Sequence, residues 1–328
     1  MMKKLLISFL CTIGMASLAA DVAAEAKAAL EKVTPNTITY KAENGWLYSK
    51  NELAHLAKGE LAGGKVTKVS ACRKPQNANP LPALKAFNDE LKALNIRLIL
   101  LPVPPKAAAE PLGALKPLDA MMYLRPFYAE LRAAGLEVLD VSECFSADPS
   151  TPLYCRTDAH WSPAGIALAV RELGKRIELR GDAAFEVSAS RQTIAGDLAK
   201  SLSADAPETE EIALQTVTGK AIDESSPILL IGDSHTLIFS AGGDMLAERA
   251  GLAEQLVALL KMPIDRIGVK GSAATAVRVN LYRKAVRNPD WLKNKKFVIY
   301  CFSCREFTES TSGWVTVPVM KNGEMLLE

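Results

Sequence analysis

The chain has 328 residues, of which 49% are hydrophobic and 23% are charged, and its formal net charge is +2. This composition is typical of a globular protein and excludes an intrinsically disordered chain. A net charge so close to zero, without a basic run interleaved with aromatics, gives no electrostatic reason to expect nucleic acid or an anionic membrane as a partner. The length allows one large α/β domain or two small ones.

The first residues match a Sec signal peptide. Lys3 and Lys4 make residues 1–4 positive, and residues 5–18 form an apolar stretch that is too short to span a bilayer comfortably. Small residues follow, and the candidate cleavage sites lie after Ala19, Ala20 and Ala24. We therefore expect residues 1–24 to be a signal peptide and the mature chain to be periplasmic. An uncleaved membrane anchor is the alternative.

Hydrophobic periodicity predicts helices that alternate with buried strands. Helices are expected over residues 21–32, 84–94, 121–134 and 163–177. Short apolar runs predict strands over residues 97–104, 136–141, 227–231, 266–269 and 297–302. Because such alternation implies parallel pairing, the predicted fold class is α/β, with three α/β/α layers around a five-stranded, mostly parallel sheet.

The rest of the chain is expected to belong to the same domain. The polar stretch 201–211 is predicted to be a surface loop, and no internal repeat or low-complexity linker interrupts the pattern. Residues 25–328 are therefore predicted to form a single domain. With the last residue at Glu328, we expect no separate C-terminal carbohydrate-binding module.

Segments that carry candidate site residues come directly after three of the predicted strands. These residues are Ser234, the pair Lys270 and Gly271, and Arg305. Asp158 and His160 lie in the long connection after the second strand. In an open parallel sheet the binding crevice lies beyond the carboxyl ends of the strands. We therefore expect these segments, distant in sequence, to meet at one edge of the sheet.

Asp158, His160 and Ser234 are the candidate catalytic residues. A serine hydroxyl is a poor nucleophile until a base takes its proton, and the base works best when a carboxylate orients it. His160 would be that base and Asp158 the carboxylate, while the Ser234 N–H would face the oxyanion at the start of a helix. Alternatively, Ser234 is only the N-cap of that helix. His235 is the rival base, although a neighbour on the first helical turn normally points away from the serine.

The two Asp-x-His segments also resemble two halves of a metal site. Asp158 with His160, and Asp233 with His235, offer carboxylate and imidazole ligands that suit zinc, iron or manganese. A metallophosphoesterase should carry further Asn, His and Asp ligands, which are missing from this sequence. We therefore expect neither a metal nor another cofactor. The metal alternative predicts that chelation abolishes activity.

Four further residues are candidates for holding the oxyanion or the substrate: Gly271, Lys270, Arg305 and Trp161. Gly271 could supply an N–H donor and Lys270 a cation near the acyl oxygen, although a glycine after a strand often just makes a turn. Arg305 would contact the substrate, or be a solvated or ion-paired arginine. Trp161 is expected close to the site, where it would either stack on a sugar ring or be buried.

Five cysteines remain after the predicted cleavage: Cys72, Cys144, Cys155, Cys301 and Cys304. Disulfides are permitted in an oxidising compartment, and a Cys144–Cys155 bond would close a short loop before Asp158. We expect this pair first, and the odd count leaves at least one thiol free or paired to another chain. Cys301 and Cys304 have metal or redox spacing but lack a second cysteine pair.

The chain resembles the AlgX/AlgJ-like periplasmic SGNH-fold O-acetyltransferases of alginate and other exopolysaccharides over most of its mature length. The motifs that carry the resemblance are Gly45-Trp46-Leu47, Pro102-Val103-Pro104-Pro105-Lys106, Asp158-x-His160-Trp161 and Gly232-Asp233-Ser234. The Asp-x-His segment precedes the serine, whereas most SGNH hydrolases place theirs near the C-terminus. A clear Gly-x-Asn-Asp block is missing, which leaves the second oxyanion donor undefined.

The resemblance implies a flavodoxin-like α/β/α sheet with a Ser234–His160–Asp158 triad. It also implies an acetyl-serine intermediate, a polysaccharide acceptor, and a membrane-bound acyl-transfer protein as the acetyl donor. Three functions remain open: an exported O-acetyltransferase, an SGNH carbohydrate esterase or deacetylase with the same triad, and a non-catalytic glycan-binding export scaffold. The scaffold predicts that Ser234→Ala leaves polymer modification unchanged in cells.

Overall fold

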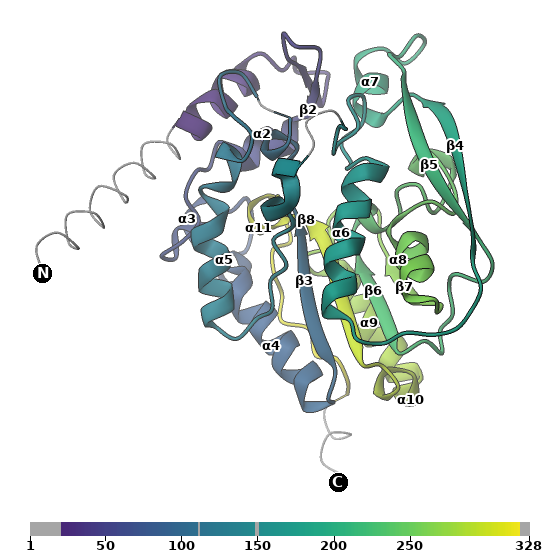
Figure 1. Ribbon diagram of the computed structural model, residues 1–328. Helices are drawn as coiled ribbons and strands as arrows, with labels where there is room; N and C mark the ends of the chain where they lie inside the picture. Colours follow the sequence, from purple (N-terminus) through teal and green to yellow (C-terminus); the bar gives the residue numbers. More distant parts are fainter. Residues whose placement is uncertain (1–20, 111, 148–150, 322–328) are drawn as a thin grey trace, which may run out of the picture.

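The centre of the molecule is a sheet of parallel strands. The computed structural model describes residues 21–110, 112–147 and 151–321. The strands of the central sheet are β3 (Arg97–Val103), β6 (Ile228–Gly232), β7 (Asp265–Gly268) and β8 (Phe297–Ser303). Their order is β3-β8-β6-β7, and every neighbouring pair is parallel. The carboxyl ends of all four strands therefore lie at one edge of the sheet (Figure 1).

The expected strand at residues 136–141 is reduced to one bridge. Leu100 and Val138 form an isolated parallel bridge beside β3, with backbone hydrogen bonds to the N–H and the carbonyl of Leu100. The chain then turns, because the Asp140 carboxylate accepts hydrogen bonds from the N–H and the hydroxyl of Ser142. Within the described residues the sheet thus has four strands rather than five, whereas the α/β class is confirmed.

Two apolar cores lie on opposite faces of the sheet, because side chains alternate along each strand. Leu98 and Leu100 of β3 belong to one core, while Ile99 and Leu101 belong to the other. The helices of the first core include α4 (Pro80–Ala93), α5 (Leu124–Ala133) and α9 (Ala276–Arg287). Those of the second are α6 (Pro163–Arg176) and α8 (Leu252–Leu260). The predicted three-layer arrangement is confirmed (Figure 1).

Helix α6 begins where its capping residues predict. The Ser162 hydroxyl accepts hydrogen bonds from the N–H groups of Ala164 and Gly165, and Pro163 occupies the first helical position. This cap fixes the direction in which the chain leaves the segment 157–161. The helix therefore holds the candidate Asp-x-His segment against the second core.

Two antiparallel hairpins lie outside the central sheet. The first consists of β1 (Thr39–Lys41) and β2 (Leu47–Ser49), and the second of β4 (Glu186–Ile194) and β5 (Glu210–Thr218). The second hairpin was not predicted, because most of β4 is exposed and lacks the apolar alternation that identifies a strand. Part of the expected surface loop 201–211 belongs to α7 (Asp197–Leu202) and to β5.

The remaining helices are short. They are α2 (Lys50–Leu56), α3 (Lys65–Val69), α10 (Pro289–Lys293) and α11 (Glu306–Glu309). Residues 21–31 are also helical, close to the range predicted. Most of the predicted signal peptide lies outside the described residues. In the part of the chain that the structure describes, no helix has the length and apolar character needed to cross a membrane.

The expected Cys144–Cys155 disulfide is absent. Both residues are free thiols, as are Cys72, Cys301 and Cys304. Cys155 is buried beside the Asp-x-His segment, where its thiol donates to the Trp161 carbonyl at 3.8 Å. Cys144 instead lies next to Glu172 of α6. The two side chains therefore have different neighbours, and short sequence spacing alone did not bring them together.

Candidate active site

Ser234 lies at the carboxyl end of β6, where the chain leaves the sheet in a tight turn. Gly232 permits a close approach of β8, since a Cβ there would lie 1.8 Å from a carbonyl oxygen of that strand. The Asp233 carboxylate caps the next turn by accepting a hydrogen bond from the His235 N–H. The helix expected after β6 is a single 3-10 turn, Ser234–Thr236. Asp233 rather than Ser234 is the cap residue, which leaves the serine hydroxyl available for another partner.

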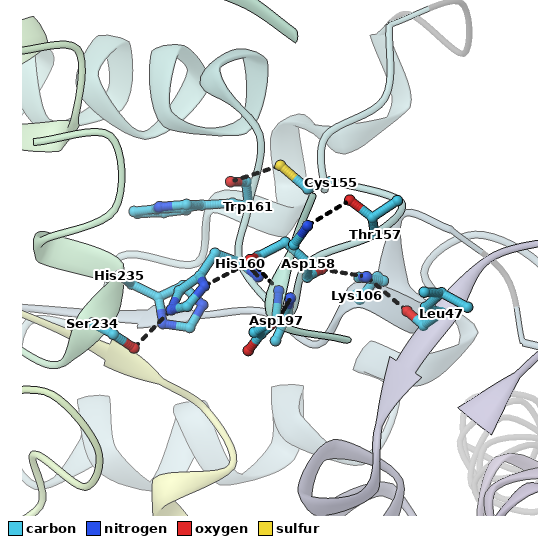
Figure 2. A network of polar contacts seen from close by, with 12 residues as sticks. Leu47, Lys106, Cys155, Thr157, Asp158, His160, Trp161, Asp197, Ser234 and His235 are labelled. Atoms are coloured by element: carbon cyan, nitrogen blue, oxygen red, sulfur yellow. Dashed lines mark hydrogen bonds and ion pairs between the residues drawn. The ribbon is translucent and has the colours of Figure 1, made fainter. Parts of the chain in front are cut away.

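Asp158, His160 and Ser234 form a continuous chain of hydrogen bonds (Figure 2). His160 Nε2 lies 2.7 Å from Ser234 Oγ, and His160 Nδ1 lies 2.6 Å from Asp158 Oδ1. All three side chains are buried. Because an ionised carboxylate only accepts hydrogen bonds, Nδ1 carries the ring proton and Nε2 presents a lone pair to the hydroxyl. A serine nucleophile and its general base require this geometry.

Two backbone N–H groups also fix the Asp158 carboxylate. Its Oδ1 accepts from the His160 N–H and its Oδ2 from the Asp197 N–H, both at 3.0 Å. Gly196 permits the second contact, because a Cβ there would lie 2.5 Å from the Asp158 Cβ. The Asp197 carboxylate in turn accepts from the Ala159 N–H at 2.8 Å. Residues 196–197 were not predicted to belong to the site, since they lie in none of the recognised motifs.

Lys106 connects three of the motifs on which the family resemblance rests. Its side chain is 1% exposed, and Nζ donates to the carbonyl oxygens of Leu47 and Asp158, both at 2.7 Å. The rings of Trp46 and Tyr48 have their centroids 5.8 Å from Nζ. Lys106 thus ties the backbone of Asp158 to the β1–β2 hairpin (Figure 2). The sequence marked Lys106 as part of a motif but did not predict this role.

The charges of the triad shift the pKa values of its members. Burial would raise the pKa of Asp158, but the His160 ring and the N–H donors hold it well below its ordinary value. Burial would lower the pKa of His160, but the Asp158 carboxylate raises it above the ordinary 6.5. Burial and the Asp158 charge together raise the pKa of Asp197. Asp158 is therefore the carboxylate that stays ionised beside the imidazole.

A second Asp-x-His pair lies against the first. Asp233 Oδ1 accepts a hydrogen bond from His235 Nδ1 at 3.1 Å, and Asp233 Oδ2 accepts one from the Ser303 N–H at 2.7 Å. The ring centroids of His235 and His160 are 4.8 Å apart. Of these two rings, His160 is the one hydrogen-bonded to the Ser234 hydroxyl.

The two pairs do not combine into one metal site. Within the described ranges, the cluster of three carboxylate and imidazole groups whose ligand atoms lie within 4.8 Å of one another is Asp158, His160 and Asp197. His160 Nδ1 is hydrogen-bonded to Asp158 and His160 Nε2 to Ser234, so neither ring nitrogen is free to bind a metal. Asp233 and His235 are outside this cluster, so the geometry does not support the metal site that the sequence pattern suggested.

Lys270 and Gly271 lie after β7, next to the carboxyl end of β6. The Lys270 ammonium forms an exposed ion pair with Asp244, with Nζ–O distances of 2.6 and 2.7 Å. Gly271 has a φ of +87°, in the left-handed region that favours glycine in a turn. In the described part of the chain neither residue hydrogen-bonds to the triad. An oxyanion role for either one remains a prediction.

Arg305 and Trp161 both act on the imidazoles of the site, Arg305 through its charge and Trp161 through a ring contact. Burial lowers the pKa of His235 despite the opposing charge of Asp233, and the charges of His160 and Arg305 lower it further. Arg305 is half-buried and therefore accessible to a substrate. Trp161 is only 2% exposed, and its ring meets the His235 ring edge-on at 5.7 Å. Trp161 is therefore a core residue beside the site and not an open platform for a sugar ring.

A parallel α/β/α sheet with a buried Ser–His–Asp chain beyond its strands is the architecture of an SGNH hydrolase-like domain. The family model for the SGNH hydrolase-like domain of the acetyltransferase AlgX matches residues 40–282. The chain belongs to this family.

Two curated relatives, both named probable alginate O-acetylase AlgJ, resemble part of the chain. The protein from Pseudomonas syringae pv. tomato is 29% identical over 137 residues, which are 40% of this chain and 31% of that protein. The protein from Pseudomonas aeruginosa is 26% identical over 140 residues, which are 41% of this chain and 32% of that protein. The match thus spans about a third of the length of these relatives.

Two solved structures share the fold. The O-acetyltransferase domain of Pseudomonas putida AlgJ superposes with a TM-score of 0.60 at 21% identity, covering 83% of this chain and 92% of that one. Pseudomonas aeruginosa AlgX superposes with a TM-score of 0.56 at 18% identity, covering 82% of this chain and 62% of that one. At such low identity these likenesses establish the fold alone.

Proposed function

We propose that the protein is an exported O-acetyltransferase that moves an acetyl group through an acyl-serine intermediate onto hydroxyls of an exopolysaccharide such as alginate. The observation that carries the proposal is the buried chain from Ser234 Oγ through His160 to Asp158, with distances of 2.7 and 2.6 Å. Membership in the acetyltransferase family and the likeness to probable alginate O-acetylases support the acetyl group and the class of polymer.

In the first half-reaction, Ser234 Oγ attacks the carbonyl carbon of the acetyl donor while His160 Nε2 takes the hydroxyl proton. Asp158 stabilises the imidazolium that forms. The Ser234 N–H is the proposed donor to the oxyanion, and Gly271 N–H and the Lys270 ammonium are further candidates. His160 then gives the proton to the leaving group of the donor, which leaves an acetyl ester on Ser234.

In the second half-reaction, a sugar hydroxyl takes the place of water. His160 Nε2 accepts the hydroxyl proton as the sugar oxygen attacks the acetyl carbonyl, and the bond to Ser234 Oγ breaks as that oxygen regains a proton from His160. Arg305 is the proposed contact with the substrate, because the residue is half-buried and its charge acts on both imidazoles. This cycle needs no metal.

The proposed setting is the periplasm, reached through the Sec signal predicted at residues 1–24. Acetyl-coenzyme A is a cytoplasmic donor, so an exported acetyltransferase depends on a second protein that carries acetyl groups across the membrane. A membrane-bound acyl-transfer protein is therefore the proposed donor partner, and the polysaccharide is the acceptor.

Transfer of the acetyl group from Ser234 to a sugar is tested by adding an oligosaccharide acceptor. The protein is incubated with a chromogenic acetyl ester, with and without an uronic-acid oligosaccharide, and the acetylated sugar is quantified by mass spectrometry. We expect acetyl groups on the oligosaccharide and faster release of the chromophore when the acceptor is present. Release of acetate alone, unchanged by the acceptor, would instead identify a carbohydrate esterase with the same triad.

The pH dependence of acylation follows from the pKa of His160. Only the neutral imidazole accepts the Ser234 proton, and the Asp158 carboxylate raises the pKa of His160 above 6.5 despite burial. We therefore expect the rate of chromophore release in the initial burst to fall as the pH decreases, with a midpoint above 6.5. A midpoint well below this value would show that His160 is not the titrating base.

A non-catalytic scaffold is the contrasting possibility. It predicts that polymer acetylation in cells is the same with Ser234→Ala as with the unaltered protein. The proposed mechanism predicts that this substitution abolishes acetylation while leaving the level of the protein unchanged, since within the described residues the serine hydroxyl hydrogen-bonds to His160 alone.

A further inference from the structure

The two Asp-x-His segments have the same internal hydrogen bonds. In the first, Asp158 Oδ1 accepts from the His160 N–H at 3.0 Å and from His160 Nδ1 at 2.6 Å. In the second, Asp233 Oδ1 accepts from the His235 N–H at 2.9 Å and from His235 Nδ1 at 3.1 Å. Each aspartate therefore fixes the tautomer of its histidine, so that Nδ1 is protonated and Nε2 keeps a lone pair.

The Nε2 atoms of His160 and His235 differ in their hydrogen-bond partners. His160 Nε2 is hydrogen-bonded to the Ser234 hydroxyl at 2.7 Å. Within the described residues no side-chain hydrogen bond reaches His235 Nε2, and this atom is not among the fully buried unpaired ones, while its ring lies 4.8 Å from that of His160. An oriented acceptor beside the nucleophile, without a protein donor, is suited to a group that arrives with the substrate.

The surroundings of His235 hold the ring in place and keep it neutral. Trp161 packs edge-on against one side at 5.7 Å, and Asp233 is itself fixed by the Ser303 N–H at 2.7 Å. Burial lowers the pKa of His235, and the charges of His160 and Arg305 lower it further, while Asp233 opposes them. A neutral imidazole whose Nδ1 is bonded to Asp233 can accept a hydrogen bond at Nε2, while His160 remains the partner of the Ser234 hydroxyl.

We propose that His235 binds the acceptor sugar, with Nε2 accepting a hydrogen bond from the hydroxyl adjacent to the one that is acetylated. This inference rests on the proposed function. The acceptor class it defines is a vicinal diol, in which one hydroxyl faces His160 and its neighbour faces His235. Water and simple alcohols carry no second hydroxyl, so the contact favours transfer to sugar over hydrolysis.

No proton is transferred to His235 in this step. The attacking hydroxyl gives its proton to His160 Nε2 as its oxygen bonds to the acetyl carbon. The bond from that carbon to Ser234 Oγ breaks, and Oγ takes the proton from His160. The adjacent hydroxyl keeps its proton and donates it as a hydrogen bond to His235 throughout, so His235 positions the acceptor while His160 performs the acid–base chemistry.

The test measures how the acetyl group on Ser234 partitions between transfer to sugar and hydrolysis by water. The full-length protein is acetylated with a chromogenic acetyl ester in the presence of a methyl hexoside or its deoxy analogue, which lacks the hydroxyl adjacent to the acetylated one. The readout is the ratio of acetylated sugar to free acetate. This ratio does not depend on how fast Ser234 is acetylated, so a change in acylation rate alone leaves it unmoved.

With the unaltered protein, we expect the deoxy sugar to lower the ratio about tenfold, the effect of one hydrogen bond. His235→Phe should lower the ratio for the intact sugar by about the same factor, with no further loss for the deoxy sugar. His235→Gln, which keeps an acceptor oxygen, should restore part of the preference. The matched control is His55→Phe, because His55 is also buried but bonds to Thr308 and not to the triad.

Equal ratios for the two sugars with the unaltered protein would overturn the inference. So would a tenfold preference that persists in both His235 variants. These results are distinct from failure of the proposed function, in which neither sugar is acetylated by any variant, whether or not Ser234 takes up an acetyl group.

Discussion

Replacing Asp158 with asparagine is expected to slow acetylation of Ser234 by on the order of 10³ to 10⁴ while leaving the fold intact. The carboxylate accepts from His160 Nδ1 at 2.6 Å and so keeps the lone pair of Nε2 toward the Ser234 hydroxyl. An asparagine whose oxygen still accepts from the Asp197 N–H presents an N–H to the His160 ring, which favours the tautomer that cannot accept the serine proton. The burst of chromophore from an acetyl ester measures this rate.

The same variant also changes the pH dependence. The Asp158 charge is what raises the pKa of His160, against burial, which lowers it. Removing the charge should move the acid limb of the residual rate to lower pH. Asp197→Asn is the matched control, because the Asp197 side chain accepts from the Ala159 N–H and does not bond to His160. If both variants slowed the burst equally, Asp158 would have no special role.

Replacing Lys106 with methionine is expected to lower the free energy of unfolding by about 3 kcal/mol and to slow acetylation of Ser234 at least tenfold. The substitution keeps an apolar side chain of similar length but removes the donor to the Leu47 and Asp158 carbonyl oxygens, both 2.7 Å away. It also leaves the buried Glu52 carboxylate without the cation that most lowers its pKa. The backbone of Asp158 is then no longer linked through Lys106 to Leu47 in the β1–β2 hairpin.

Urea denaturation measures the free energy of unfolding. The burst of chromophore from the acetyl ester, recorded under conditions in which the variant is folded, measures the rate of Ser234 acetylation. Lys85→Met is the control, because Lys85 forms an exposed ion pair with Asp89 at 2.5 Å on the surface of α4. Such pairs contribute little to stability, so its unfolding midpoint should stay close to that of the unaltered protein. Equal midpoints for the two variants would show that the buried Lys106 contacts are not needed.

The residues of the triad were predictable because their chemistry is visible in the sequence. A histidine two positions after an aspartate, and a serine after a Gly-Asp turn at the end of an apolar run, restrict the mechanism before any fold is known. Their convergence followed from the alternation of strands and helices, since parallel strands bring their carboxyl ends to one edge. The two cores that cover the sheet followed from the same pattern.

The features that the sequence did not predict depend on contacts between distant backbone segments. Asp197 reaches Asp158 through its N–H, and Lys106 reaches it through the Asp158 carbonyl. Neither contact depends on a side-chain pattern that is local in the chain. The prediction of a strand over residues 136–141 was wrong for a local reason, because the chain turns at Asp140 after a single bridge at Val138. The apolar run before that aspartate was too weak a signal to show where pairing stops.

Trp161 and the cysteines show the limit of reasoning from residue type. A tryptophan beside a candidate sugar site was open to stacking, yet this one is 2% exposed and packs on His235. Cys144 and Cys155 are close in sequence, but one lies against α6 and the other is buried beside Trp161. Burial and partner identity are properties of the whole fold, so spacing alone could not decide either case.

Intact-mass spectrometry tests the central claim, that Ser234 carries the acetyl group. The protein is incubated briefly with a chromogenic acetyl ester, and the reaction is quenched in acid. The intact mass is then measured, and the modified peptide is identified by tandem mass spectrometry. We expect one added acetyl group on Ser234 in the unaltered protein and none with Ser234→Ala. It should accumulate much more slowly with His160→Ala, but not with His55→Ala. An acetyl group that forms equally well in the Ser234→Ala variant, or none in any variant, would contradict the account.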